Sequence, residues 1–136
     1  MINITDLRIG NYIQVRWAVG DMHELLEIRE INYTNHTIKH QLTINDDKLE
    51  DIVGIVLNET WLNQFGFNVN ERVASKTANN ETQFNISLYS DTYTQKPCWK
   101  YDGLNTIGKI KYLKYVHQLQ NLYEDITKER LSCYEN

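Results

Sequence analysis

Apolar and polar residues alternate along several short stretches of this chain, which is the period of a half-buried β-strand. The alternation is clearest at residues 38–44. Residues 6–16 are expected to bend at Gly10-Asn11 and enter a strand, and residues 52–57 form a short apolar strand. The N-terminal part, residues 1–57, is therefore predicted to consist of strands.

Residues 21–32 fit two patterns. Leucine and isoleucine recur there at helical spacing, and Asp21 and Glu24 have the spacing of a capping box. Apolar and charged residues also alternate, as they do in a strand. Because the segment is short and lies between Gly20 and the turn-like residues 32–35, a strand is favoured.

The middle of the chain is predicted to hold one short helix followed by a hairpin. Asn58 has the place of an N-cap, and Gly66 has the left-handed position that ends a helix, so the helix covers residues 58–66. Residues 72–104 are predicted to form hairpin strands with a turn at 78–81.

The C-terminal part carries the pattern of an amphipathic helix over residues 112–131. Apolar and aromatic residues recur there at steps of four and three: Tyr112, Val116, Leu119, Tyr123 and Ile126. One face is therefore suited to a core. The polar residues between them need no site, because a helix docked on a sheet exposes polar residues to water.

These elements predict the α+β class. The expected architecture is a strongly bent antiparallel sheet or a small β-barrel, with a short middle helix and a C-terminal helix packed on it. A length of 136 residues is about that of one domain, so residues 1–136 are expected to form a single domain. Nine tyrosines and many threonines support a high strand content.

Apolar runs, the N-terminal residues and the number of cysteines together predict the cellular location of the protein. No run of eighteen apolar residues is present, so no membrane span is expected. The N-terminus lacks the basic head and apolar stretch of a signal peptide. Cys98 and Cys133 are too few for a disulfide framework and are expected to be thiols. The predicted location is the cytoplasm.

Charge is unevenly distributed in this acidic protein, whose formal net charge is −4. Residues 96–117 form a basic segment with five lysines and one aspartate. Aromatic residues alternate with these lysines. Lysines attract phosphate groups and aromatic faces stack on bases, so the mixture is typical of a site for a nucleotide-like anion.

The predicted ligand-binding residues all lie in this basic segment: Trp99, Lys100, Tyr101, Lys109, Lys111, Tyr112 and Lys114. The alternative is a solvated basic face whose aromatic rings point into the core. The two interpretations differ in one testable respect, because a site requires the amines and the ring faces to be exposed together.

Catalytic and metal-binding patterns are weak. His36 and His40 would lie roughly 13 Å apart along a strand, too far to share an ion, and no Cys-x-x-Cys or His-Glu-x-x-His motif occurs. No Gly-x-Ser-x-Gly turn or glycine-rich phosphate loop is present. The sequence therefore predicts a protein without catalytic residues, metal or cofactor.

Three segments resemble an uncharacterised small-protein family of Bacteroidetes genomes and their phages and prophages. They are LRIGNYI at Leu7–Ile13, IVLNETWLNQFGF at Ile55–Phe67, and IKYLKYVHQLQNLYEDITKERL at Ile110–Leu131. The family pattern runs from "LRIGN" through a "PIPLTEEWLLKFGF"-like block to "IKYVHQLQNLY". The chain departs from it by inserting Leu113-Lys114 and by lacking the middle proline. The resemblance implies a compact β-rich domain with a closing helix, often carried by mobile elements, and it implies no activity.

The functional expectation is a non-catalytic phage or prophage binding protein with a counter-defence role. It would sequester a nucleotide-like small molecule or mask a host defence protein in the cytoplasm of the host bacterium. The alternative is a small module that binds single-stranded nucleic acid; the acidic body disfavours a long duplex. Abundant aromatic residues and asparagine-rich edges are compatible with a homo-oligomer.

Overall fold

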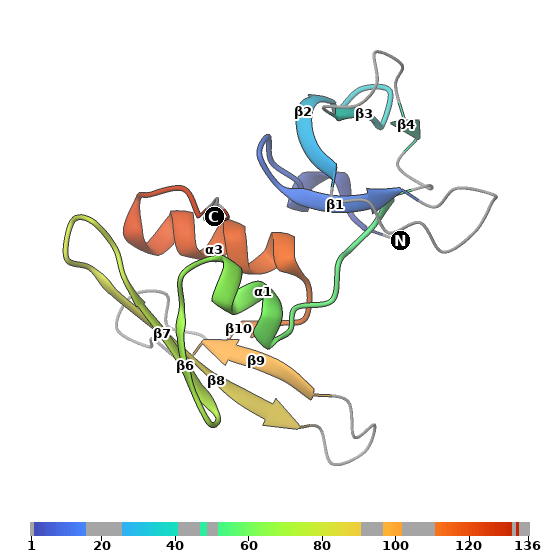
Figure 1. The fold of residues 1–136 in the computed structure, drawn as a ribbon. Coiled ribbons are helices and arrows are strands. Elements are labelled where there is room, and N and C mark those ends of the chain that lie inside the picture. The colour runs from blue at the N-terminus through green and yellow to red at the C-terminus, as the bar shows by residue number, and fades with distance from the viewer. Residues whose placement is uncertain are drawn as a thin grey trace. The chain divides into compact units, whose positions relative to one another are not determined.

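The computed structural model describes residues 2–15, 26–40, 47–48, 52–90, 97–101, 111–131 and 133. Inter-residue contacts divide the chain into two compact units, Met1–Ile55 and Val56–Asn136. Each unit has its own five-stranded antiparallel sheet (Figure 1). The α+β class is confirmed, and neither sheet is closed into a barrel. The expectation of a single domain remains a prediction.

The described residues of the first unit form one short 3-10 helix and five strands: η1 (Ile4–Asp6), β1 (Tyr12–Val15), β2 (Leu26–Asn32), β3 (Thr37–His40), β4 (Asp47–Lys48) and β5 (Ile52–Val53). The strands lie in the order β4-β3-β2-β1-β5. The strand assignment is confirmed for residues 26–32. Residues 21–25 and 41–44, which belong to the strands predicted at 21–32 and 38–44, lie outside the described residues.

The bend predicted before β1 is present. Gly10 has a φ of 95°, a conformation that costs glycine little because it has no Cβ. The Asn11 side-chain oxygen accepts a hydrogen bond of 2.7 Å from the Arg8 backbone N–H. Beyond the bend, Ile13 enters the apolar core of the first unit, whose buried members are Ile4, Leu7, Ile13, Leu26, Ile28, Ile38 and Ile52.

The second unit contains two helices and five strands within its described part: α1 (Glu59–Gln64), β6 (Asn68–Asn70), β7 (Val73–Thr77), β8 (Gln83–Ser90), β9 (Pro97–Tyr101), β10 (Lys111–Leu113) and α3 (Val116–Thr127). The strands follow one another in the order β10-β9-β8-β7-β6, so each pairs with its neighbour in the chain. The predicted hairpin is β7 and β8, and residues 102–104 of the last predicted strand lie outside the described part.

The middle helix has the ends that the sequence predicts. The Asn58 side-chain oxygen accepts a hydrogen bond of 3.0 Å from the Trp61 backbone N–H, which satisfies one of the unpaired donors of the first turn. Gly66 follows the helix with a φ of 85°. Leu62 and Phe65 face inward and are fully buried.

The C-terminal helix is shorter than the predicted 112–131. Residues Lys111–Leu113 form β10, and α3 begins at Val116, where the Gln118 side chain accepts hydrogen bonds from the backbone N–H groups of Lys114 and Tyr115. Lys128 is left-handed, with a φ of 65°, and ends the helix. The expected start was wrong because the spacing of Tyr112 to Val116 also fits a strand that leads into a helix.

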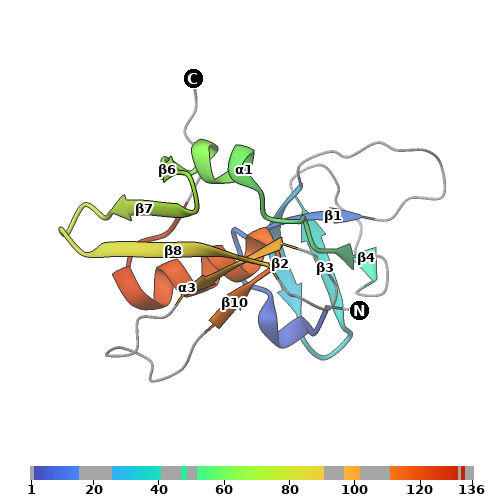
Figure 2. The same cartoon turned by 90° about the horizontal axis from the view of Figure 1, so that it is seen from below.

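Helix α3 lies along one face of the second sheet (Figures 1 and 2). The centre of this interface is Phe84 on β8, which is fully buried. Its ring stacks on Tyr101 with centroids 4.9 Å apart and meets the edge of Tyr123 of α3 at 5.2 Å. Phe67 adds a further edge contact at 6.0 Å. The predicted packing of the C-terminal helix on a sheet is confirmed.

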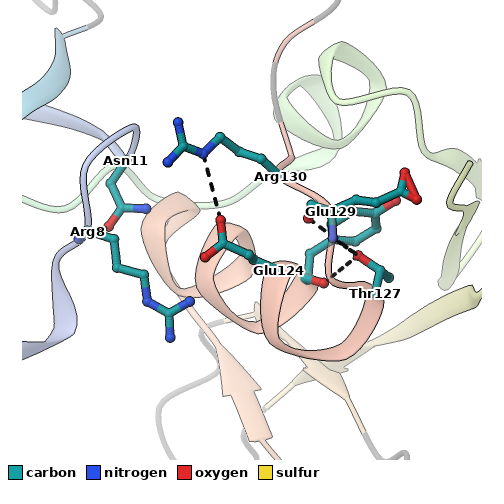
Figure 3. A network of polar contacts seen from close by, with 7 residues as sticks. Arg8, Asn11, Glu124, Thr127, Glu129 and Arg130 are labelled. Atoms are coloured by element: carbon teal, nitrogen blue, oxygen red, sulfur yellow. Dashed lines mark hydrogen bonds and ion pairs between the residues drawn. The ribbon is translucent and has the colours of Figure 1, made fainter. Parts of the chain in front are cut away.

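The β7–β8 turn is held by a carboxylate that follows α3. The backbone N–H groups of Asn79 and Asn80 donate to the two carboxylate oxygens of Glu129 at 2.9 and 3.0 Å. The Asn80 side chain also donates to the Thr127 carbonyl at 2.7 Å. Thr127 Oγ1 in turn accepts from the Glu129 backbone N–H, so the residues after the helix are fixed in place (Figure 3).

We expect Glu129→Gln to destabilise the second unit by about 1–3 kcal/mol, because an amide replaces one of two charged acceptors with a donor. Urea unfolding followed by tryptophan fluorescence would measure the change. The matched control is Arg130→Ala, which removes the exposed Glu124–Arg130 ion pair of 3.7 Å seen in the same view (Figure 3). Its effect should stay below about 1 kcal/mol. Equal effects from the two variants would contradict a structural role for the carboxylate.

Candidate functional site

Strand alternation gives the second sheet two different faces. One face packs under α3 and carries Ala74, Phe84, Ile86, Trp99 and Leu113, all of them buried. The residues of opposite parity form what we call the exposed face, and most are polar: Asn68, Asn70, Val73, Ser75, Thr77, Gln83, Asn85, Ser87, Tyr89, Cys98, Lys100 and Tyr112. A sheet covered by helices on one face only leaves such a platform for other contacts.

Strand register places five of these residues in a line across the sheet. Asn70 pairs with Val73, Val73 with Ser87, Ser87 with Lys100, and Lys100 with Tyr112: the row is Asn70, Val73, Ser87, Lys100 and Tyr112. Directly paired side chains on one face lie close enough to touch. The row therefore joins all five strands into one continuous surface.

Two tyrosines and a lysine gather at the β10 side of this row. The Tyr89 and Tyr112 rings have centroids 5.6 Å apart and are tilted by 53°. Lys100 Nζ lies 5.7 Å from the centroid of the Tyr89 ring, which is cation–π distance. Tyr89 is 38% exposed and Tyr112 is 53% exposed. The cluster thus offers ring surface and a cation to solvent together.

The structure separates the residues of the predicted site. Lys100 and Tyr112 lie on the exposed face as neighbours across β9 and β10. Lys111 is exposed but has the opposite parity, and Lys114 is exposed with its Nζ 5.5 Å from the centroid of the Tyr115 ring. Lys109 lies outside the described residues.

The two other aromatic residues of the predicted site are part of the core. Trp99 is 5% exposed and Tyr101 is 6% exposed, and Tyr101 stacks on Phe84. Their rings stabilise the second unit and present no face to a ligand. Because side chains of a strand alternate, Trp99 and Tyr101 must point away from the side of Lys100.

Tyr89 was missed by the sequence prediction because it lies outside the basic segment. A signal was present: Phe84, Ile86 and Leu88 alternate as the apolar face of a strand, which puts Tyr89 on the polar face. An aromatic residue on a polar face is a candidate for binding, since it gains nothing from the core.

The electrostatic character of the exposed face differs from that of the whole chain. Its described members include Lys100 and no aspartate or glutamate, in a protein with a formal net charge of −4. Apart from Val73, the remaining side chains are amides, hydroxyls and a thiol, which can donate and accept hydrogen bonds without a charge of their own. An anion is therefore not repelled locally.

Other candidate sites among the described residues have fewer groups that could bind a ligand. A hollow of about 380 Å³ lies at the β2–β3 hairpin, where Lys39 and Glu30 form an ion pair of 3.5 Å that already satisfies both charges. Within the described ranges, no three His, Cys, Asp or Glu side chains are grouped to hold a metal ion. Cys98 and Cys133 are both thiols.

Comparison with known proteins found no match among protein-family models, curated proteins or solved structures. Within the described part of the chain, none of the helices has both the length and the apolar character needed to cross a membrane.

Proposed function

We propose that this chain is a non-catalytic binding protein that takes a nucleotide-like anion on the exposed face of its second sheet. The supporting observation is the cluster of Tyr89, Lys100 and Tyr112, in which two accessible rings lie beside a cation. A base would stack on the solvent-facing side of Tyr112, and a phosphate would be attracted to Lys100.

The distance between the two tyrosine rings defines how a base would bind. Centroids 5.6 Å apart leave no room for a base between the rings, so it would lie on top of one of them. Stacking on a single ring is tolerant of base identity because every base has a π-face. We therefore expect weak discrimination among the four bases and clear discrimination against ligands without a ring.

The proposed setting follows the resemblance to phage and prophage proteins. A protein of this kind in the cytoplasm of a host bacterium would act in counter-defence by occupying its ligand, which requires shape and charge and no turnover. Masking of a host defence protein is the competing role, because an exposed face with two tyrosines also suits a protein partner.

Removal of the Tyr112 ring is expected to weaken nucleotide binding about 5- to 150-fold, the range for loss of one base–aromatic stack. Isothermal titration with a panel of ribonucleoside and deoxyribonucleoside monophosphates would measure it for Tyr112→Ala. Lys100→Glu should weaken binding as well, because it reverses the charge beside the rings. Circular dichroism of each variant would verify that the fold is retained.

Two matched controls separate the site from general effects. Tyr33→Ala removes another tyrosine that is 53% exposed, in the first unit, and should leave affinity unchanged. Lys111→Glu changes the same charge as Lys100→Glu but at a position of opposite parity, and its effect should be smaller. Wild-type affinity in Tyr112→Ala, or no binding by any member of the panel, would refute the proposed function.

A further inference from the structure

We infer that the exposed face binds single-stranded nucleic acid that runs across the strands along the row from Tyr112 to Asn70. The inference rests on the proposed function and extends it from one nucleotide at the tyrosine cluster to several along the sheet. It depends on the continuity of the row, which the strand register establishes pair by pair.

The length of the row exceeds what one nucleotide needs. Neighbouring strands are about 4.8 Å apart, so four steps from β10 to β6 span about 19 Å. A strand that follows the row therefore places several nucleotides on the exposed face, as single-stranded sites of this kind do. A lone nucleotide on Tyr112 would leave Ser87, Val73 and Asn70 without any contact.

The residues beyond the tyrosine cluster have the chemistry of base edges. Asn70 in the row carries an amide that both donates and accepts, and so do Asn85 and Gln83, which lie on the same face two and four residues from Ser87 along β8. Asn70, Asn85 and Gln83 are all exposed. Gln83 Nε2 donates to the Asn85 side-chain oxygen at 3.3 Å, which leaves further donor and acceptor capacity on both side chains. A bare phosphate would use few of these groups, whereas the polar edges of unpaired bases match them.

The low positive charge of the exposed face favours a single strand over a duplex. A duplex presents its phosphates outward, and Lys100 is the sole cation among the described members of the exposed face. A single strand can turn its bases to Tyr89 and Tyr112 while most of its phosphates stay in water. With one or two phosphates contacted, the logarithm of affinity should fall with the logarithm of salt concentration with a slope of about −0.7 to −1.4.

Fluorescence anisotropy with labelled oligothymidylates of two, four, six and ten nucleotides would test the inference, with thymidine monophosphate as an unlabelled competitor. Affinity is expected to rise at least tenfold between two and six nucleotides. A probe of ten should gain little more, because the row ends at β6. A duplex of the same length should bind at least tenfold more weakly.

Charge substitutions on the exposed face away from the tyrosine cluster separate this inference from the proposed function. Asn70 lies at the far end of the row, and Asn85 lies beside the row, two residues from Ser87 on β8. Asn70→Asp and Asn85→Asp keep the side-chain shape, add one negative charge each and should weaken binding of the six-nucleotide probe about threefold or more. Binding of thymidine monophosphate should not change. Asn63→Asp adds the same charge at an exposed position of α1 and should affect neither ligand.

Equal affinity for the monophosphate and all oligomers would overturn the inference and leave the proposed function standing. Absence of binding to both ligands would overturn both. A neutral oligosaccharide that binds the same face without salt dependence would overturn both as well, since amides and tyrosines also suit sugars.

Discussion

Replacing Phe84 with alanine is expected to lower the free energy of unfolding of the second unit by about 3–5 kcal/mol, the range for loss of a buried phenylalanine. Phe84 is 0% exposed and contacts the rings of Phe67, Tyr101 and Tyr123. Removal of the ring loses its transfer free energy and leaves a cavity among three aromatic neighbours that cannot collapse into it. It also removes the Phe84–Tyr123 ring contact between β8 and α3.

Urea unfolding of Phe84→Ala, followed by near-ultraviolet circular dichroism, would measure this loss. Asn85→Ala is the matched control: it is the next residue of β8, points to the exposed face and should change stability by less than about 0.5 kcal/mol. Phe84→Leu, which keeps much of the volume, should fall between the two. If Phe84→Ala were as stable as Asn85→Ala, the central place of this ring in the core would be wrong.

Replacing Ile28 with alanine is expected to destabilise the first unit by about 2–5 kcal/mol. Ile28 is 0% exposed and belongs to the apolar core of that unit. Its backbone N–H and C=O are bonded to Asn11 and Gly10, at 2.9 and 2.8 Å, so the substitution removes side-chain packing without removing these hydrogen bonds. The cost should therefore come from the cavity and the lost burial.

Hydrogen exchange measured residue by residue would follow the effect of Ile28→Ala on β1, β2 and β3. The control is Arg29→Ala, which removes an exposed ion pair of 3.8 Å with Glu27 and should cost less than about 1 kcal/mol. If the amide protection of β1, β2 and β3 in Ile28→Ala were the same as in the wild-type protein, the expected result would be contradicted.

The same pair of core variants tests the prediction of a single domain. If residues 1–136 unfold as one cooperative domain, Phe84→Ala and Ile28→Ala must each lower protection in both units by the same amount. If protection falls only in the unit that carries the substitution, the two compact units, Met1–Ile55 and Val56–Asn136, unfold separately.

Several local elements could be predicted because short-range physics determines them. Asn58 satisfies a backbone donor of the first turn of α1, and Gly66 takes a left-handed conformation after its end; neither depends on distant residues. The alternation of Phe84, Ile86 and Leu88 likewise identifies the buried side of β8. The start of α3 could not be read this way, because a step of four residues occurs both within a helix and across a strand–helix junction.

The candidate site, in contrast to these local elements, could not be predicted from short stretches of sequence. A basic and aromatic run in the sequence suggested one surface, yet strand alternation sends Trp99 and Tyr101 into the core and leaves Lys100 outside. Tyr89, which comes from another strand, completes the cluster with Tyr112. Residues adjacent in a strand belong to different faces, so a continuous surface is assembled from different strands.

The sequence alone determined the α+β class, the capped middle helix and the buried parity of the central hairpin, because propensity, capping and period are local properties. Only the tertiary structure decided that the strands form two sheets, that α3 begins after β10, and that Tyr89, Lys100 and Tyr112 meet. These features depend on which strands pair and in which register. That choice is made by burial of side chains far apart in the chain, which no short stretch of sequence records.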